Sequence, residues 1–315
     1  MPRSVARSKP CIVDAVATFW RFLSLCGSAP AHDRVALFRS TVVRANDTAY
    51  GVALGFDERA IRGFLRRTET RLDDLRGTQT AFRYLVQHHW ARCATALPDL
   101  DEDVDLYLLP APSHAIGGAV RRFGARQAIV FGTEQLEHLR AREVNLGVFM
   151  SHEFAHLYHA QVNPEMREAS ARYFAEVPPT AGARLYQILW LEGFASYVSG
   201  RLEPAASASD VLSSSTVEQS VEANRAALAA AVLEGFDSED RDAIDRFVYW
   251  GDPGAGLHPR TGYALGLVTA RRLAAEHDLA SLARLRGDPL RAALRRALAA
   301  YAASSQGPEG PRTDS

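Results

Sequence analysis

The sequence predicts an α+β protein that is mostly α. Two short β-rich runs, at 104–110 and 127–132, indicate a small sheet. Apolar residues with helical spacing before and after these runs place the sheet between two helical parts. We therefore expect an N-terminal helical region at 1–100, a core with the sheet and two functional helices at 101–202, a C-terminal helical lobe at 203–303 and a disordered tail at 304–315.

The N-terminal part contains three segments with helical spacing. Residues 13–25 place Val, Phe and Leu side chains on one stripe, and 57–75 repeats such a stripe among charged residues. A third helix is expected at 80–97, because Pro98 cannot continue it. The segment 33–55 favours no element.

The sheet region consists of two expected strands with a glycine-containing connection. The run at 104–110 ends at Pro110, and the paired glycines Gly117 and Gly118 indicate a loop or hairpin before the second run. From about residue 134 the chain is expected to be almost wholly helical. Two segments interrupt this pattern, a Ser/Ala-rich connection at 203–216 and a Gly/Pro-rich loop at 251–260.

Composition excludes several classes of protein. The chain has 315 residues with a net charge of −1, so no overall field attracts it to nucleic acid or to an anionic membrane. Its three cysteines contain no C-x-x-C pair, which argues against a disulfide framework and a cysteine zinc site. These features predict a cytoplasmic protein with neither a nucleic-acid nor a membrane partner, and they leave its oligomeric state open.

Export as a lipoprotein is the competing interpretation of the N-terminus. The segment "F-L-S-L-C-G" loosely resembles a lipoprotein cleavage site at Cys26. Asp14 and Arg21 interrupt the apolar region that such a signal needs, and Leu25 is large where a small residue is expected. The sequence therefore favours the cytoplasmic prediction.

The segment 151–159, "S-H-E-F-A-H-L-Y-H", carries the strongest functional signal. Asn145 is a suitable cap for a helix through this segment. Four residues along a helix correspond to about 40° of rotation and ~6 Å of rise, so His152 and His156 project from one face and can bind one Zn²⁺. Glu153 lies beside them, where a general base could take a proton from a zinc-activated water.

This motif needs a third ligand to be convincing. A chance H-E-x-x-H has a likelihood of roughly 2% in a chain of this length, so the motif alone does not establish a site. His159 shares the helix face, but one rigid helix cannot wrap three ligands around a zinc ion. We expect His159 to be a surface residue or one that supports the ligands. The metzincin pattern is excluded, because it needs glycine at His159 and histidine at Val162.

Glu192 is the candidate third ligand. It falls on the apolar stripe of a helix in the segment 185–200, where an unpaired carboxylate would be costly to bury. Its partner could be an arginine or a zinc ion held by His152 and His156. Small residues at Gly193 and Ser196 would allow close approach to the histidine helix, and the two observations together favour the metal.

On these residues the chain resembles the gluzincin zinc metallopeptidases, in which a glutamate from a later helix completes H-E-x-x-H. Between His156 and Glu192 the spacing is 36 residues, which suits that class. "W-L-E-G-F-A" is similar to its glutamate-ligand segment. More narrowly, the chain looks like a group of bacterial predicted zinc-dependent proteases of unknown function, which also have a late "G-Y-x-x-G" helix, here 262–266.

The resemblance implies a zincin-like catalytic core acting on a peptide or protein substrate. It implies that one Zn²⁺ per chain is held by His152, His156 and Glu192, with Glu153 as general base. It further implies that the strand at 127–131 is the sheet edge along which an extended substrate could lie.

Tyr263, in the late segment, is the candidate for stabilising the oxyanion of the tetrahedral intermediate. A core tyrosine is the alternative, and His258 and Arg260 are weaker candidates for the same task. In thermolysin-like enzymes a carboxylate one turn after the glutamate ligand orients a zinc-bound histidine. Here that position is Ser196, so the orienting group could be Ser196, another carboxylate or a backbone carbonyl.

Three functional hypotheses follow. The first is a zinc-dependent metallopeptidase. The second is a non-catalytic helical protein in which a structural metal or polar cluster binds a partner protein. The third is a zinc hydrolase that cleaves a non-peptide amide. An inert cluster has no need of Glu153 beside three ligands, so this residue favours catalysis.

Overall fold

The computed structural model describes residues 9–27, 29–53, 57–112, 117–123, 126–174 and 182–304. It is α+β and mostly helical, with a small mixed sheet, in agreement with the fold class expected from the sequence. The chain divides into two compact units, Met1–Ala94 with Leu100–Leu157, and Thr95–Asp99 with Tyr158–Ser315. This division falls within helix α7 (Leu146–Val162), whereas the sequence analysis placed boundaries near residues 100 and 202. Apart from Ser304, the expected tail lies outside the described residues.

The first unit contains the sheet. In the described residues it has four strands in the order β1-β2-β4-β3. Strands β1 and β4 each pair in parallel with β2, and β3 pairs antiparallel with β4. The strands are β1 (Cys11–Asp14), β2 (Val104–Leu109), β3 (Gly118–Phe123) and β4 (Arg126–Gly132).

Two expectations about the sheet are wrong. Val13 and Asp14 lie in β1 and not in a helix, because Val13 pairs with Tyr107, a partner that local spacing cannot reveal. The strand at 127–131 is not an edge, since β4 lies between β2 and β3. The glycine-containing connection forms the other half of a hairpin, which makes β3 the end strand of the described sheet.

The helices of the first unit pack around clusters of aromatic side chains. Phe19, Phe22, Phe38 and Phe64 form one such cluster, with ring centroids 5.4–6.2 Å apart. The helical elements are α1 (Val16–Cys26), α2 (Ala31–Phe38), the π-helix η1 (Arg39–Val43), α3 (Asp47–Ala53), α4 (Glu58–Glu69), α5 (Leu72–Ala96), α6 (Thr133–Ala141) and the larger part of α7.

The helix expected at 57–75 is two helices. Asp57 caps α4 by accepting a hydrogen bond from the Ala60 N–H. A turn in which the Arg71 N–H donates to the Thr68 carbonyl separates α4 from α5, so Leu72 and Leu75 belong to α5. The charged residues on both sides of this turn gave no breaker signal in the sequence.

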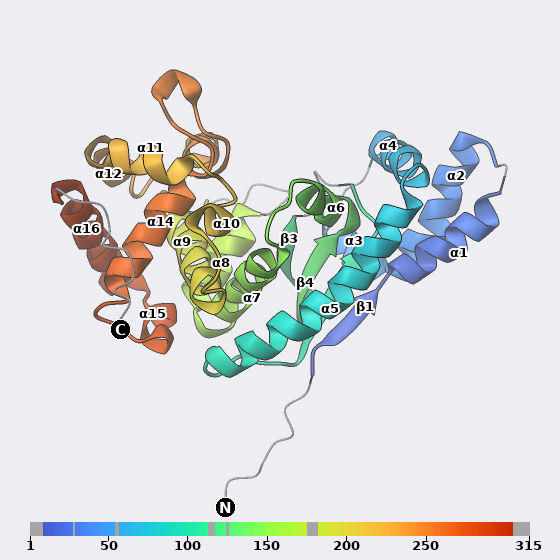
Figure 1. The fold of residues 1–315 in the computed structure, drawn as a ribbon, viewed down its shortest axis with the longest axis horizontal. Helices are drawn as coiled ribbons and strands as arrows, with labels where there is room; N and C mark the ends of the chain where they lie inside the picture. Colours follow the sequence, from blue (N-terminus) through green and yellow to red (C-terminus); the bar gives the residue numbers. More distant parts are fainter. Residues whose placement is uncertain are drawn as a thin grey trace, which may run out of the picture. The chain divides into compact units, whose positions relative to one another are not determined.

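Helices α5 and α7 pack on the sheet through aromatic contacts. Phe82 of α5 meets Phe131 of β4 with ring centroids 5.3 Å apart, where α5 crosses the sheet (Figure 1). Phe149, in the first turn of α7, also contacts Phe131, at 6.1 Å. Trp90 of α5 meets Phe154 of α7 edge-on at 5.1 Å. Helix α7, which carries the H-E-x-x-H motif, therefore packs against both α5 and the sheet.

The second unit is helical in its described residues and is built around α9 (Leu185–Leu202). Almost every residue of α9 from Leu185 to Ser199 is buried, so this helix forms the centre of the unit. The other elements are α8 (Pro164–Tyr173), α10 (Ala208–Leu212), α11 (Val217–Ala223), α12 (Arg225–Glu234), α13 (Arg241–Asp245), the π-helix η2 (Arg246–Trp250), the 3-10 helix η3 (Pro253–Ala255), α14 (Thr261–Leu273), α15 (Leu279–Arg284) and α16 (Gly287–Ala303). Because α10 lies within it, the connection at 203–216 is partly helical.

Helices α9 and α14 cross at two glycines. A Cβ built on Gly193 would lie 2.5 Å from the Gly266 Cα, and one built on Gly266 would lie 2.5 Å from the Leu189 carbonyl oxygen. Neither helix could carry a side chain at this point without moving. The close crossing fixes the position of Glu192, which precedes Gly193 in the chain.

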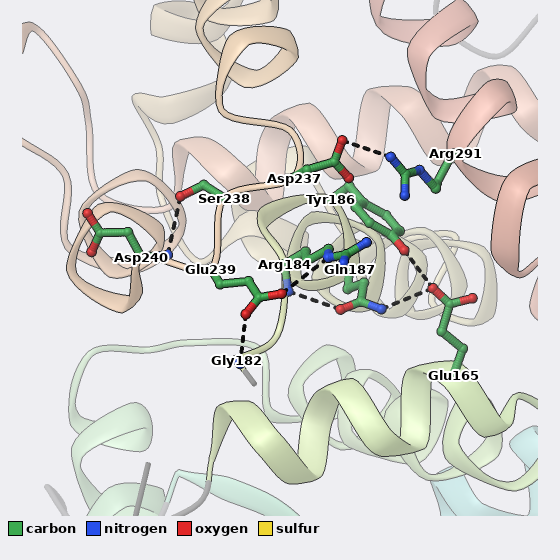
Figure 2. Close-up of polar contacts among 10 residues, drawn as sticks. All are labelled: Glu165, Gly182, Arg184, Tyr186, Gln187, Asp237, Ser238, Glu239, Asp240 and Arg291. Atoms are coloured by element: carbon green, nitrogen blue, oxygen red, sulfur yellow. Dashed lines mark hydrogen bonds and ion pairs between the residues drawn. The ribbon is translucent and has the colours of Figure 1, made fainter. Parts of the chain in front are cut away.

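Glu165 in α8 joins the starts of two other helices (Figure 2). Its carboxylate accepts hydrogen bonds from the Tyr186 hydroxyl at 2.8 Å and the Gln187 amide at 3.0 Å, both in α9. It also accepts from the backbone N–H of Gly287, the first residue of α16, at 2.6 Å. Burial alone would raise the pKa of Glu165, but these hydrogen bonds and the Arg184 charge outweigh it and lower the pKa.

Among the described residues, none of the helices combines the length and the apolar content needed to cross a lipid bilayer.

Candidate metal centre

Helix α7 begins where the sequence placed its cap. The Asn145 side-chain oxygen accepts hydrogen bonds from the backbone N–H groups of Gly147 and Val148, at 3.0 and 3.2 Å. This capping satisfies two donors of the first turn. Within this helix His152 and His156 lie one turn apart on the same face.

The structure brings together the three residues that the sequence analysis assigned as ligands. One ligand atom from each of His152, His156 and Glu192 lies within 4.8 Å of the other two, and within the described residues this group could hold a metal ion. The Nε2 atoms of His152 and His156 are 3.0 Å apart. His156 is partly accessible, whereas Glu192 is only 3% exposed.

The separation of the two imidazole nitrogens is compatible with a shared metal ion such as zinc. Two imidazole nitrogens bound tetrahedrally to zinc at about 2.0–2.1 Å would be about 3.3 Å apart. The observed separation of 3.0 Å is close to that value. A donor set of two nitrogens and one carboxylate oxygen also matches the ligands of catalytic zinc sites, which leave the fourth position open.

Glu153 belongs to the same helix but not to the group of ligands. Its side chain is buried, with 8% of its surface exposed. Gly118, at the start of β3, lies so close that an added Cβ would be 2.4 Å from the Glu153 Cδ. The carboxylate is therefore confined between α7 and the backbone of the end strand, and Glu153 directly follows His152 in the sequence.

Glu192 has a partner that the sequence analysis missed. The Tyr249 hydroxyl donates a hydrogen bond to the Glu192 Oε1 at 2.7 Å. Tyr249 lies in the π-helix η2, a wider turn of a kind that often occurs at functional sites. Its sequence context, "F-V-Y-W", carries no motif, so no signal in the sequence distinguished Tyr249 from an ordinary core aromatic residue.

A group of aromatic rings surrounds Tyr249. Tyr173 stacks on it, with ring centroids 5.8 Å apart, and Tyr263 meets it edge-on at 5.7 Å. The Tyr173 hydroxyl in turn donates to the Asp245 carboxylate. Burial, reinforced by the negative charge of Glu192, raises the pKa of Tyr249 well above its usual value, so its phenol is a hydrogen-bond donor at neutral pH.

The remaining candidates have different surroundings. Tyr263 is buried beside Tyr249, and the Arg260 guanidinium lies 4.4 Å from its ring centroid. Arg260 also donates to the Leu212 carbonyl at 2.9 Å. His258 is exposed and lies in the loop before α14. The Ser196 hydroxyl is buried and makes no hydrogen bond with the described residues, so it does not orient a histidine ligand.

His159 is fully buried, and the expectation that it could be a surface residue is wrong in that respect. Its ring lies against the rings of Phe194 and Trp190, with centroids 4.3 and 6.2 Å away. It is not among the described residues that form the possible ligand group. The wrong expectation has a physical reason. Helix α9 is apolar and buried on every side, so the His159 ring that packs against it is buried as well.

Comparison of the chain with protein-family models, with curated proteins and with solved structures gave no match. What the site can do chemically must therefore be inferred from its own residues. Within the described residues, two imidazoles and a buried carboxylate could share a metal ion, and a second buried carboxylate, Glu153, directly follows His152 in the sequence.

Proposed function

We propose that the protein is a zinc-dependent metallopeptidase with a zincin-like core. The observation that supports this most directly is the convergence of His152, His156 and Glu192 within 4.8 Å. The two histidines come from one helix and the glutamate from a later one, as the resemblance to gluzincins implied. Glu153 directly follows His152 in the sequence and is not part of this group, which suits a general base and would be superfluous in a purely structural metal site.

Each residue has a distinct task in the proposed reaction. His152, His156 and Glu192 would hold one zinc ion, which supplies Lewis acidity when bound. Glu153 takes a proton from the attacking water and delivers it to the nitrogen of the leaving amine. Tyr263 donates a hydrogen bond to the oxyanion, an interaction that strengthens as negative charge develops.

The end strand β3 offers a place for an extended peptide. It pairs only with β4 among the described strands, and a substrate strand could add to its other side through backbone hydrogen bonds. Gly118, at the start of β3, lies against Glu153. A peptide bond held along β3 near Gly118 would therefore be close to the proposed base. This assigns to β3 the substrate edge that the sequence analysis placed at 127–131.

We place this activity in the cytoplasm. The three cysteines are free thiols and Cys26 is buried in α1, which favours a reducing compartment over attachment of a lipid. The proposed partners are peptide or protein substrates.

The test begins with metal analysis. Purified wild type should contain one zinc per chain, and His156→Ala should lose it, because two remaining ligands bind zinc weakly. His88→Ala removes an exposed histidine from α5 and should keep the full zinc content. Absence of stoichiometric zinc from wild type after reconstitution would overturn the proposal.

A peptide-library assay then tests catalysis. Glu153→Gln should retain zinc but hydrolyse peptides about 10²–10⁴-fold more slowly than wild type, the range attributed to general acid–base catalysis. If wild type carries zinc yet Glu153→Gln matches it on every substrate, the metal has a structural role. The alternative, a non-catalytic protein that binds a partner, would then be favoured.

A further inference from the structure

A hydrogen bond to the proposed glutamate ligand has no counterpart in the sequence motif. The Tyr249 hydroxyl donates to the Glu192 Oε1 at 2.7 Å, and both residues belong to the second unit. A carboxylate that binds zinc through one oxygen can still accept a hydrogen bond at the other. A donor on one oxygen therefore restricts how the carboxylate can rotate about its last bond.

The phenol leaves the charge of Glu192 intact. Tyrosine has an ordinary pKa of about 10, so at neutral pH it is a neutral donor. A lysine or arginine at this position would neutralise the carboxylate and compete with a metal ion for it. A phenol can therefore orient a carboxylate while leaving it an anionic ligand.

Tyr249 is itself held rigidly. Its ring stacks on Tyr173 at 5.8 Å and meets Tyr263 edge-on at 5.7 Å. Its carbonyl accepts a hydrogen bond from the Arg260 N–H at 3.2 Å. The wider turn of the π-helix η2 places the residue in this packing. Three neighbouring groups thus fix the ring that carries the donor, which is what precise orientation of a ligand requires.

We propose that Tyr249 is the positioning residue for the metal ligand Glu192, and that its hydrogen bond tightens zinc binding. The inference rests on the proposed function, because it assumes that the three ligands bind zinc. It goes beyond that function in assigning the orientation of the site to a tyrosine of η2. The position one turn after the glutamate, Ser196, does not supply this interaction.

Tyr249→Phe removes the donor and keeps the ring. Competition with a chromophoric chelator should show that this variant binds zinc about 10–100-fold more weakly than wild type, the usual cost of losing a group that orients a ligand. With Co²⁺ in place of zinc, the visible absorption bands should change in position or intensity, because the geometry of the carboxylate changes.

Tyr186→Phe is the matched control. Tyr186 also donates to a glutamate, since its hydroxyl bonds to the Glu165 Oε1 at 2.8 Å. This variant loses a hydrogen bond of the same kind in the same unit and should keep the zinc affinity and Co²⁺ spectrum of wild type. A merely structural role for Tyr249 would make the two variants behave alike.

A second measurement applies even if Tyr249→Phe does not fold. With 3-fluorotyrosine incorporated, the ¹⁹F resonance of residue 249 should shift when zinc is added, and the resonance of residue 186 should not. If wild type binds zinc but resonance 249 stays unchanged, or if folded Tyr249→Phe binds zinc as tightly as wild type, the inference is wrong and the proposed function stands. If wild type binds no zinc, both fail.

Discussion

The backbone of Gly118 lies directly against the carboxylate of Glu153. A Cβ added at Gly118 would be 2.4 Å from the Glu153 Cδ and 2.8 Å from its Oε2, distances at which one of the groups must move. The end strand of the sheet and the proposed base are therefore positioned together. A small change in either should affect the other.

We expect Gly118→Ala to lower peptidase activity while the zinc content stays unchanged. The added methyl group would displace Glu153 by a fraction of an ångström to about 1 Å, and misplacement of this size can cost about 10²-fold in rate. Initial rates and metal analysis of the same preparation would check this. Gly117→Ala is the control, because an added Cβ there meets no atom of the described residues within 4 Å. Equal rates for the two variants would show that Glu153 tolerates the shift.

Removal of the Tyr263 hydroxyl should slow the reaction without releasing zinc. Loss of one oxyanion donor typically costs about 10²–10³-fold in kcat, so Tyr263→Phe should lose that much with little change in KM. Tyr84→Phe, which alters a tyrosine that is 67% exposed, should keep the wild-type kcat. An unchanged kcat for Tyr263→Phe would mean that Tyr263 is a core residue only.

Gly266→Ala should destabilise the second unit. Alanine normally favours a helix over glycine by about 1 kcal/mol, but here its Cβ would lie 2.5 Å from the Leu189 carbonyl oxygen. Because backbone atoms cannot rotate away, we expect a net loss of about 1–3 kcal/mol in the free energy of unfolding, as for other overpacked sites. Urea denaturation would measure it, with Gly235→Ala as control, where the nearest contacts of a Cβ are an ordinary 3.5 Å. A stability gain at Gly266 would contradict the close crossing.

Glu137 should make stability fall as the pH rises. Burial raises the pKa of this carboxyl from 4.5 to about 7, although the nearby Arg71 opposes the shift. The folded state therefore holds a proton that the unfolded state releases between these two values. The stabilisation from this group is complete below about pH 4.5 and is lost as the pH rises through about 7.

Thermal melts of Glu137→Gln would test this, because glutamine imitates the protonated carboxyl. We expect the variant and wild type to melt at similar temperatures at pH 5, and the variant to melt a few degrees higher at pH 8. Parallel pH profiles of the two proteins would show that Glu137 ionises freely in the folded state.

Local patterns predicted much of the fold and the three residues that come together in a group able to hold a metal ion. The spacing of His152 and His156 on a capped helix is a local property, and the cost of burying Glu192 was visible in its apolar stripe. Most helices follow the 3.6-residue periodicity that the sequence displays. These features depend on neighbours within a few residues, which is why the sequence alone carries them.

What the sequence did not reveal depends on distant partners. Strand β1 exists because Val13 pairs with Tyr107, and the segment that the sequence predicts as a loop or hairpin forms β3 because it pairs with β4. The hydrogen bond between Tyr249 and Glu192 joins residues 57 positions apart. No motif marks such a pair, because its geometry arises only when η2 packs beside α9.

The parallel pairing of β1 with β2 has a consequence for biosynthesis. Cys11 lies opposite Asp105, so this strand must wait until the ribosome has added 94 further residues, from position 11 to position 105. At about 5–20 residues per second, that interval lasts on the order of 5–20 s. During this time the segment of β1 in the nascent chain has no strand partner. Chaperones that recognise unpaired β-segments would therefore bind this protein near its N-terminus.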